Sequence, residues 1–264
     1  MEEAQPLVMR AIDNLYWYED ERAAMMAEAR NQETRMTRIL YSLCGADESR
    51  PFSPHCWKVV LALHHKGLDF VERPSPFTKI SEIEGGFSKT VPILRDGNEL
   101  IRDSFDIALY LEDKYPDRPT LFGGEGGKAL SRFVERFSQS IVHPAISQFA
   151  VPHIHDMLGE TDQVYFRASR EKLLGKTLEE MRASREAAVT AFAVKLEPVR
   201  QTLGYQAYLG GDAPLFADYI LFGALQWMRI TTGAQVFAND DPVKAWFERC
   251  LDLHNGVGRS VTPA

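Results

Sequence analysis

The residues that could do chemistry in this sequence lie between Arg50 and Trp57, in the order Arg-Pro-Phe-Ser-Pro-His-Cys-Trp. An apolar run typical of a strand precedes them. Ser53 and Pro54 suit the N-cap and the first position of a helix, because they satisfy or tolerate unpaired backbone groups there. A redox protein with this strand, loop and helix would carry a thiol where Ser53 stands. The hydroxyl excludes disulfide exchange but leaves the binding of an external thiol open.

Ser53 could act on such a thiol by keeping it ionised. A free thiol with a pKa near ~8.5 is mostly protonated at neutral pH, whereas the thiolate is the nucleophile. The N–H groups of a helix N-terminus and a hydrogen bond donated by a hydroxyl both favour the anion. Lowering the thiol pKa by about one to two units, or roughly 1.4–2.7 kcal/mol, makes thiolate a major species at pH 7. The alternative is that Ser53 only caps its helix.

The elements that must position Ser53 form an α/β segment over residues 38–122. The patterns of apolar residues and turn signals predict strands at 39–43, 68–71, 91–94 and 99–101, and helices at 54–67, 78–84 and 105–114. Asp96-Gly97 is a hairpin signal between the last two strands. A linker rich in Pro and Gly, at 116–127, ends the segment.

Beyond the linker, residues 128–260 are expected to form an all-helical domain. Long periodic runs fall at 128–157, 162–202, 216–232 and 241–254, with no alternation typical of strands. Residues 1–37 form an N-terminal extension that is either helical and solvated or a non-native start, since Met36 offers a natural beginning.

Composition restricts the partners. The net charge of −7 argues against a nucleic-acid partner, which would need a basic face. No apolar run approaches the roughly 18 residues that span a bilayer, so no membrane partner is expected. Three cysteines in 264 residues suit a reducing compartment better than a disulfide framework. We therefore expect a cytoplasmic protein.

Ser53, Val91-Pro92 and Asp103-Ser104, followed by the linker and the helical runs, resemble the cytosolic glutathione transferase superfamily over residues 38 to 258. The resemblance implies a thioredoxin-like α/β N-terminal domain plus an all-α C-terminal domain. Ser53-Pro54 with Trp57-Lys58 is most similar to the bacterial lignin β-aryl-ether-cleaving transferases, or β-etherases. Leu215 departs from the family, which has Ser, Thr or Asn there, so the helix after it is expected to lose a cap worth roughly 1 kcal/mol.

The resemblance implies that glutathione is the co-substrate and that Ser53 is the catalytic residue that stabilises its thiolate. The implied glutathione-binding residues are Lys89, Thr90, Val91, Pro92, Asp103 and Ser104. A cis Val91–Pro92 bond would present the Val91 backbone to the cysteinyl part, Asp103 and Ser104 would take the γ-glutamyl end, and Lys89 the glycyl carboxylate. The alternatives are an edge-strand proline, an ordinary helix cap and a solvated lysine.

A small hydrophobic or aromatic electrophile would bind next to Ser53, in a pocket whose predicted lining is Phe52, Phe149, His153 and Met157, with core packing as the alternative. No metal is expected, because His153 and His155 have no third ligand at metal spacing.

The predicted function is that of a Ser-type glutathione S-transferase, which cleaves aryl ethers if the resemblance extends to the substrate. The alternatives are a non-catalytic protein that binds glutathione and aromatic ligands, and a glutathione-dependent isomerase. A homodimer is expected from the family.

Overall fold

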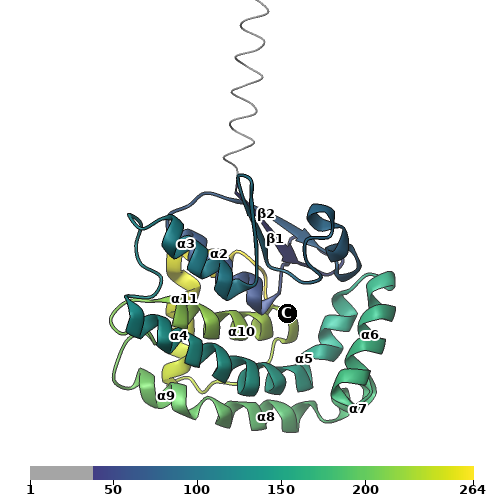
Figure 1. Cartoon of the computed structure of the whole chain (residues 1–264). Coiled ribbons are helices and arrows are strands. Elements are labelled where there is room, and N and C mark those ends of the chain that lie inside the picture. Colours follow the sequence, from purple (N-terminus) through teal and green to yellow (C-terminus); the bar gives the residue numbers. More distant parts are fainter. Residues whose placement is uncertain (1–37) are drawn as a thin grey trace, which may run out of the picture.

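The computed structural model describes residues 38–264, so the predicted extension 1–37 lies outside the described residues. A four-stranded sheet opens the described chain, in the order β2-β1-β3-β4 (Figure 1). Its strands are β1 (Arg38–Leu43), β2 (Val71–Ser75), β3 (Ile93–Asp96) and β4 (Glu99–Arg102). β1 pairs in parallel with β2, whereas β3 is antiparallel to both β1 and β4.

The second strand begins where the sequence predicts it to end, so the prediction of 68–71 is wrong. Leu68 belongs instead to the C-terminus of the preceding helix, α2 (Pro54–His65). Gly67 has a φ of 61°, and the Leu68 N–H donates to the Leu63 carbonyl at 3.0 Å. This pattern closes a helix with a glycine and a buried apolar contact, which accounts for the apolar residue at position 68.

The remaining elements of the α/β part are a short 3₁₀ helix, η1 (Phe77–Gly85), and α3 (Ser104–Lys114). Helix α2 is buried along most of its length because it lies between the sheet and α10 (Phe216–Thr232), a helix of the C-terminal part (Figure 1). Gly223 allows the close approach: a Cβ at this position would lie 2.2 Å from the Pro54 carbonyl oxygen. Helix α10 therefore packs directly against the turn that carries Ser53.

The C-terminal part is helical throughout, and α10 runs through its centre (Figure 1). Its other elements are α4 (Glu125–Phe137), the π-helical turn η2 (Ser138–Val142), α5 (His143–Met157), α6 (Glu160–Leu174), α7 (Leu178–Ala183), α8 (Arg185–Lys195), α9 (Glu197–Leu203), α11 (Pro242–Gly256) and η3 (Val257–Arg259). This is the thioredoxin-like α/β domain followed by an all-helical domain that the sequence predicts.

The predicted helical run over 162–202 is helical, but it is divided into the four helices α6 to α9. Helix α6 ends at Gly175, which has a φ of 65°. Thr177 then starts α7 with a capping box, in which its hydroxyl accepts from the Glu180 N–H and the Glu180 carboxylate accepts from the Thr177 N–H. Pro198 lies in the first turn of α9. These local signals end and start helices inside a stretch whose polar composition looks continuous.

Asp218 holds the start of α10 despite the missing cap at Leu215. Its buried carboxylate accepts hydrogen bonds from the backbone N–H groups of Leu209, Gly210 and Leu215 at 2.7–3.0 Å, and from the Trp246 indole at 2.8 Å. Leu215 provides no side-chain cap, but the four hydrogen bonds to Asp218 connect the start of α10 to the preceding loop and to α11. Within residues 38–264, no helix has both the length and the apolar character needed to cross a membrane.

Candidate functional site

Ser53 is the N-cap of α2 and is 4% exposed. Its Oγ accepts a hydrogen bond from the Cys56 N–H at 3.4 Å. A hydroxyl that accepts in this way still has its own proton to donate. Capping the helix and donating to a bound thiolate are therefore compatible roles for one side chain.

The loop before α2 is fixed by contacts with the sheet and with α10. The Phe52 N–H donates to the Leu43 carbonyl at 3.1 Å, and the Trp57 indole donates to the Pro51 carbonyl at 3.1 Å. The Arg50 guanidinium donates to the Ile230 carbonyl, near the end of α10, at 2.8 Å. The position of Ser53 thus depends on both parts of the chain.

A first cavity, of about 590 Å³, lies between α2, β3 and the start of α3. We call it the glutathione cavity, because all six residues predicted to bind glutathione line it. The structure adds the residues His55, Gly86, Phe87, Ser88, Arg102, Asp106 and Gln139 to its lining. Ser88 gives its Oγ–H to the Thr90 carbonyl and accepts from the Thr90 N–H, which fixes the loop before Pro92. The Val91–Pro92 peptide bond is cis, as the resemblance implies.

Asp103 caps α3 with its side chain, which accepts from the N–H groups of Phe105 and Asp106 at 2.8 and 3.3 Å. Its backbone has a φ of 70°, a conformation that costs a non-glycine residue energy and that recurs at ligand sites. Ser104 is buried at the first helical position. The pair therefore sits at a helix N-terminus that opens into the glutathione cavity, where it can bind an anion.

A second cavity, of about 510 Å³, adjoins the first and is mostly apolar. Ser53 lines it, and His55, Lys89, Thr90 and Val91 line both cavities. We call it the electrophile cavity. Its remaining lining is Leu43, Phe52, Pro54, Phe77, Ile80, His143, Ser147, Val151, Ile154, Tyr165, Phe166, Arg170, Leu173, Leu174 and Trp227. Of the four residues that the sequence predicts to line the electrophile pocket, Phe52 lines this cavity.

The other three predicted lining residues are not among the residues that line this cavity. Phe149 packs on Phe192 with ring centres 5.9 Å apart, His153 accepts a hydrogen bond from Arg185, and Met157 does not reach the cavity. Helix α5 instead contributes the residues His143, Ser147, Val151 and Ile154, which follow one another at helical spacing. Helix α5 is apolar on more than one face, so the sequence identified the helix but not the face that lines the cavity.

Histidines that sequence reasoning did not select stack beside Ser53. The His55 and His143 rings lie 5.1 Å apart at an interplanar angle of 13°, and His143 stacks on Trp227 at 5.9 Å. Burial, and then the positive charge of Lys58, lower the pKa of His55 well below its ordinary value and that of His143 to about 4. Both rings are therefore neutral at pH 7, so His55 can take part in a hydrogen bond as a neutral ring at the junction of the cavities. The position of His55 two residues after Ser53 is the sequence signal that could have identified it as a residue of the site.

The cysteines of the chain are poor nucleophiles. Burial raises the pKa of Cys56 to about 12 and that of Cys44 to about 11. Cys56 lies in the first turn of α2, where its backbone N–H donates to the Ser53 Oγ at 3.4 Å. A reactive thiol at this site has to come from a bound molecule. Among residues 38–264, no group of three or more His, Cys, Asp or Glu is arranged to hold a metal ion.

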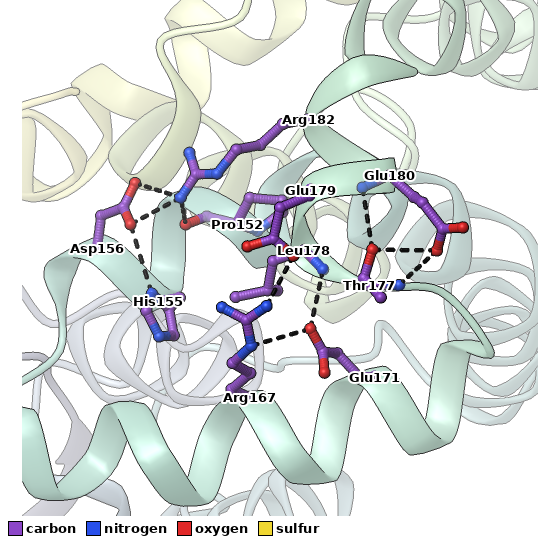
Figure 2. Close-up of polar contacts among 10 residues, drawn as sticks. All are labelled: Pro152, His155, Asp156, Arg167, Glu171, Thr177, Leu178, Glu179, Glu180 and Arg182. Carbon is purple, nitrogen blue, oxygen red and sulfur yellow. Dashed lines mark hydrogen bonds and ion pairs between the residues drawn. The ribbon is translucent and has the colours of Figure 1, made fainter.

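Helix α6 forms an outer wall of the electrophile cavity and is anchored at both ends. At its start, the Asp162 carboxylate accepts from the N–H groups of Phe77 and Thr78 at 2.7 and 3.0 Å. At its middle, Arg167 pairs with Glu171 of its own helix and with Glu179 of α7 at 3.1 and 2.7 Å. Toward its end, the Glu171 carboxylate also accepts from the Leu178 N–H at 3.1 Å (Figure 2). These contacts lie outside the cavity and fix the wall relative to η1 and α7.

Family comparisons agree with this architecture. Residues 49–119 match the family model "Glutathione S-transferase, N-terminal domain", and residues 129–253 match "Glutathione S-transferase, C-terminal domain". Together the two matches cover most of the chain, and they meet at the linker.

Individual relatives carry the same name. The chain is 23% identical to the glutathione S-transferase-like protein ustS of Aspergillus flavus, over 81% of this chain and 83% of that protein. It is 44% identical to glutathione S-transferase Z2 of Arabidopsis thaliana, over 40% of this chain and 50% of that protein. The crystal structure of glutathione transferase GSTFuA3 from Phanerochaete chrysosporium aligns with a TM-score of 0.66 at 29% identity, over 83% of this chain and 92% of that one. The chain therefore belongs to the glutathione S-transferase superfamily.

Proposed function

We propose that this protein is a Ser-type glutathione transferase, in which Ser53 donates a hydrogen bond to the thiolate of bound glutathione. The observation that carries the proposal is the place of Ser53, which caps α2 and lines the electrophile cavity two residues before His55, at whose ring this cavity joins the glutathione cavity. A sulfur held at this junction faces an apolar cavity, where an electrophilic carbon can approach it. Superfamily membership supports glutathione as the co-substrate, and a similar structure, that of a glutathione S-transferase of Ceriporiopsis subvermispora, contains glutathione.

The residues of the glutathione cavity divide by charge in a way that suits glutathione. Lys89 and Arg102 can meet its carboxylates, and Asp103 or Asp106 can meet its ammonium group. The cis Val91–Pro92 bond leaves the Val91 backbone beside this cavity, where it can pair with the cysteinyl part. The thiol then needs only a modest fall of its pKa, which the N-terminus of α2 and the Ser53 hydroxyl can supply together.

The Ser53→Ala substitution tests this role with glutathione and chlorodinitrobenzene. Losing one charge-assisted hydrogen bond of about 1.5–3 kcal/mol should lower kcat/KM by roughly 10- to 100-fold and raise the apparent pKa of the bound thiol. The thiol pKa is read from the thiolate absorbance of the enzyme–glutathione complex against pH. The Ser49→Ala variant is the control, because Ser49 is exposed and bonds to Asp47 outside both cavities. Turnover and thiol pKa that stay unchanged in Ser53→Ala would remove Ser53 from the mechanism.

Cleavage of aryl ethers is the finer proposal for the reaction. The electrophile cavity carries Phe52, Phe77, Phe166 and Trp227, which suit the two rings of an aryl ether. Attack of the thiolate on the ether-bearing carbon would form a C–S bond and release a phenolate, whose conjugate acid has a pKa near ~10. Mass spectrometry of products from a panel of aryl ethers, aryl halides and epoxides tests it. A glutathione adduct together with released phenol supports ether cleavage, and adducts from the halides or epoxides alone contradict it.

The two alternatives predict different products. A glutathione-dependent isomerase leaves the amount of glutathione unchanged while its substrate is converted. A protein that only binds glutathione and aromatic ligands shows saturable binding and no product. The homodimer and the cytoplasmic location also stay predictions, and light scattering of the purified chain tests the first.

A further inference from the structure

One wall of the electrophile cavity carries an arginine that has no acidic partner among residues 38–264. Arg170 of α6 lines the cavity and is half-buried, and burial lowers its pKa. An arginine nevertheless stays charged at neutral pH. Its neighbour Arg167 pairs with two glutamates, whereas no carboxylate among residues 38–264 pairs with Arg170. The described polar contact of Arg170 is a hydrogen bond of 3.1 Å that it donates to the Ser169 hydroxyl.

Aromatic rings hold the guanidinium in place. Its central carbon lies 4.7 Å from the centre of the Phe166 ring and 5.8 Å from that of Phe77. Both rings also line the electrophile cavity, and they contact each other at 5.3 Å. Stacking of this kind favours a cation over a ring face and leaves the edge of the guanidinium able to donate. One N–H group donates to Ser169, and the others can bind an acceptor.

The remaining lining gives the cavity a positive charge balance. Within the described part of the chain, this lining contains no Asp and no Glu, and its charged side chains are Lys89 and Arg170. Lys89 also lines the glutathione cavity, where it is proposed to meet the glycyl carboxylate. Arg170 is then the cation left for the second substrate. A half-buried charge in an apolar cavity is costly unless a bound group pairs with it.

We infer that the electrophile cavity is built for aromatic ligands that carry a carboxylate, with Arg170 as the residue that binds this group. The planar guanidinium presents two parallel N–H groups, which match the two oxygens of a carboxylate. The pairing also offsets the repulsion between an anionic substrate and the nearby thiolate. The inference rests on the proposed function in one respect, namely that the carboxylate-bearing ligand is the electrophile of the reaction. The binding of such a ligand can be measured without the reaction.

Calorimetry of the full chain with 2-naphthoate and 2-naphthamide tests the inference directly. The two ligands share their rings and differ in charge. The wild-type chain should bind the naphthoate about 10- to 100-fold more tightly, and Arg170→Met should abolish this preference, because it removes a charged hydrogen-bonding pair. Arg170→Lys keeps the charge but not the fork of donors and should fall between the two. Lys172→Gln is the matched control, because Lys172 is exposed on the same helix and does not line the cavity.

Equal binding of both ligands to the wild-type chain would overturn the inference, as would a preference for naphthoate that survives in Arg170→Met. A circular dichroism spectrum shows that each variant is folded, and Arg170→Lys provides the comparison if Arg170→Met is not. Turnover of 4-chloro-3-nitrobenzoate and of its methyl ester with glutathione separates this inference from the proposed function. If both compounds are conjugated at rates that do not depend on Arg170, the proposed transferase function stands and the carboxylate site is refuted. If naphthoate binding depends on Arg170 but neither compound is conjugated, the carboxylate site stands and the proposed transferase function is refuted.

Discussion

Gly223 is the residue that lets α10 support the start of α2, and Gly223→Ala should disturb both stability and activity. The added Cβ would lie 2.2 Å from the Pro54 carbonyl oxygen, 3.2 Å from its carbonyl carbon and 3.4 Å from the Lys58 Cγ. A carbon–oxygen contact normally needs about 3.3 Å, so one of the helices has to shift by roughly 1 Å. The first two of these atoms belong to the backbone, which cannot rotate away as a flexible side chain would.

The size of the effect follows from two opposed terms. Overpacking of a buried site costs about 1–3 kcal/mol, and a clash with backbone belongs at the upper end of this range. Alanine is favoured over glycine inside a helix by about 1 kcal/mol, which offsets part of the cost. The expected net loss in the free energy of unfolding is about 2 kcal/mol, or a fall in Tm of about 4–8 °C.

The same shift should reach the site, because Pro54 follows Ser53 directly. Misplacing a group by about 1 Å costs on the order of 100-fold in rate, so kcat/KM with chlorodinitrobenzene should fall by roughly 10- to 100-fold. Thermal unfolding and steady-state kinetics measure the two effects on the same preparation. Gly126→Ala in α4 is the control, because nothing lies within 4 Å of its added Cβ. That variant should be as stable as the wild type or slightly more so, with unchanged turnover.

A Gly223→Ala protein with wild-type Tm and wild-type turnover would refute the close-approach argument. A lower Tm with unchanged turnover would retain the packing argument but show that the shift is taken up by α10 and does not reach Ser53. The stability result does not depend on the proposed reaction, whereas the kinetic result does.

Two further predictions concern stability. Asp218→Asn should lower the free energy of unfolding by about 3 kcal/mol. The carboxylate accepts hydrogen bonds from four N–H groups, whereas an amide would direct its own NH₂ donors at some of them. A loss below about 1 kcal/mol in urea unfolding would contradict this. The pKa of His143 is lowered from 6.5 to about 4 in the folded chain, so as the pH falls the imidazole is protonated in the unfolded chain first. The contribution of His143 to the free energy of unfolding is therefore fully present above pH 6.5 and is lost progressively toward pH 4, by roughly 3 kcal/mol. The fall in unfolding free energy between pH 7 and 4.5 should be smaller in His143→Gln than in the wild type; an equal fall would show that His143 is not responsible.

Much of the fold can be predicted from the sequence, because the signals involved are local. Ser53-Pro54 determines the start of α2. The predicted hairpin turn lies between β3 and β4 as well, although Asp96 ends β3 and the two turn residues are Gly97 and Asn98. Lys89 to Pro92 and Asp103-Ser104 also meet in one cavity, because the order of the sheet brings the start of β3 next to the start of α3. Their roles toward glutathione stay predictions.

Other features were beyond the reach of local patterns. Helix α5 is apolar on several faces, so Phe149 was as plausible a lining residue as Val151 until the packing of α8 against α5 covered Phe149. Arg170 lies in a stretch rich in Arg and Glu, and its composition indicates only a solvated face. Only the fold shows that Arg167 pairs with glutamates while Arg170 lines the electrophile cavity.

The sequence by itself thus determined the order of elements in the α/β domain, the helical class of the second domain, the superfamily and the segment that holds Ser53. Caps and turns depend on residues a few positions apart, whose types restrict the backbone directly. The tertiary structure alone decided which faces line the electrophile cavity, that His55 stacks on His143, and that Gly223 has no room for a side chain. These contacts join residues roughly 90 to 170 positions apart. They depend on how whole helices pack, and the packing of a helix against distant partners is not encoded in any short stretch of its own residues.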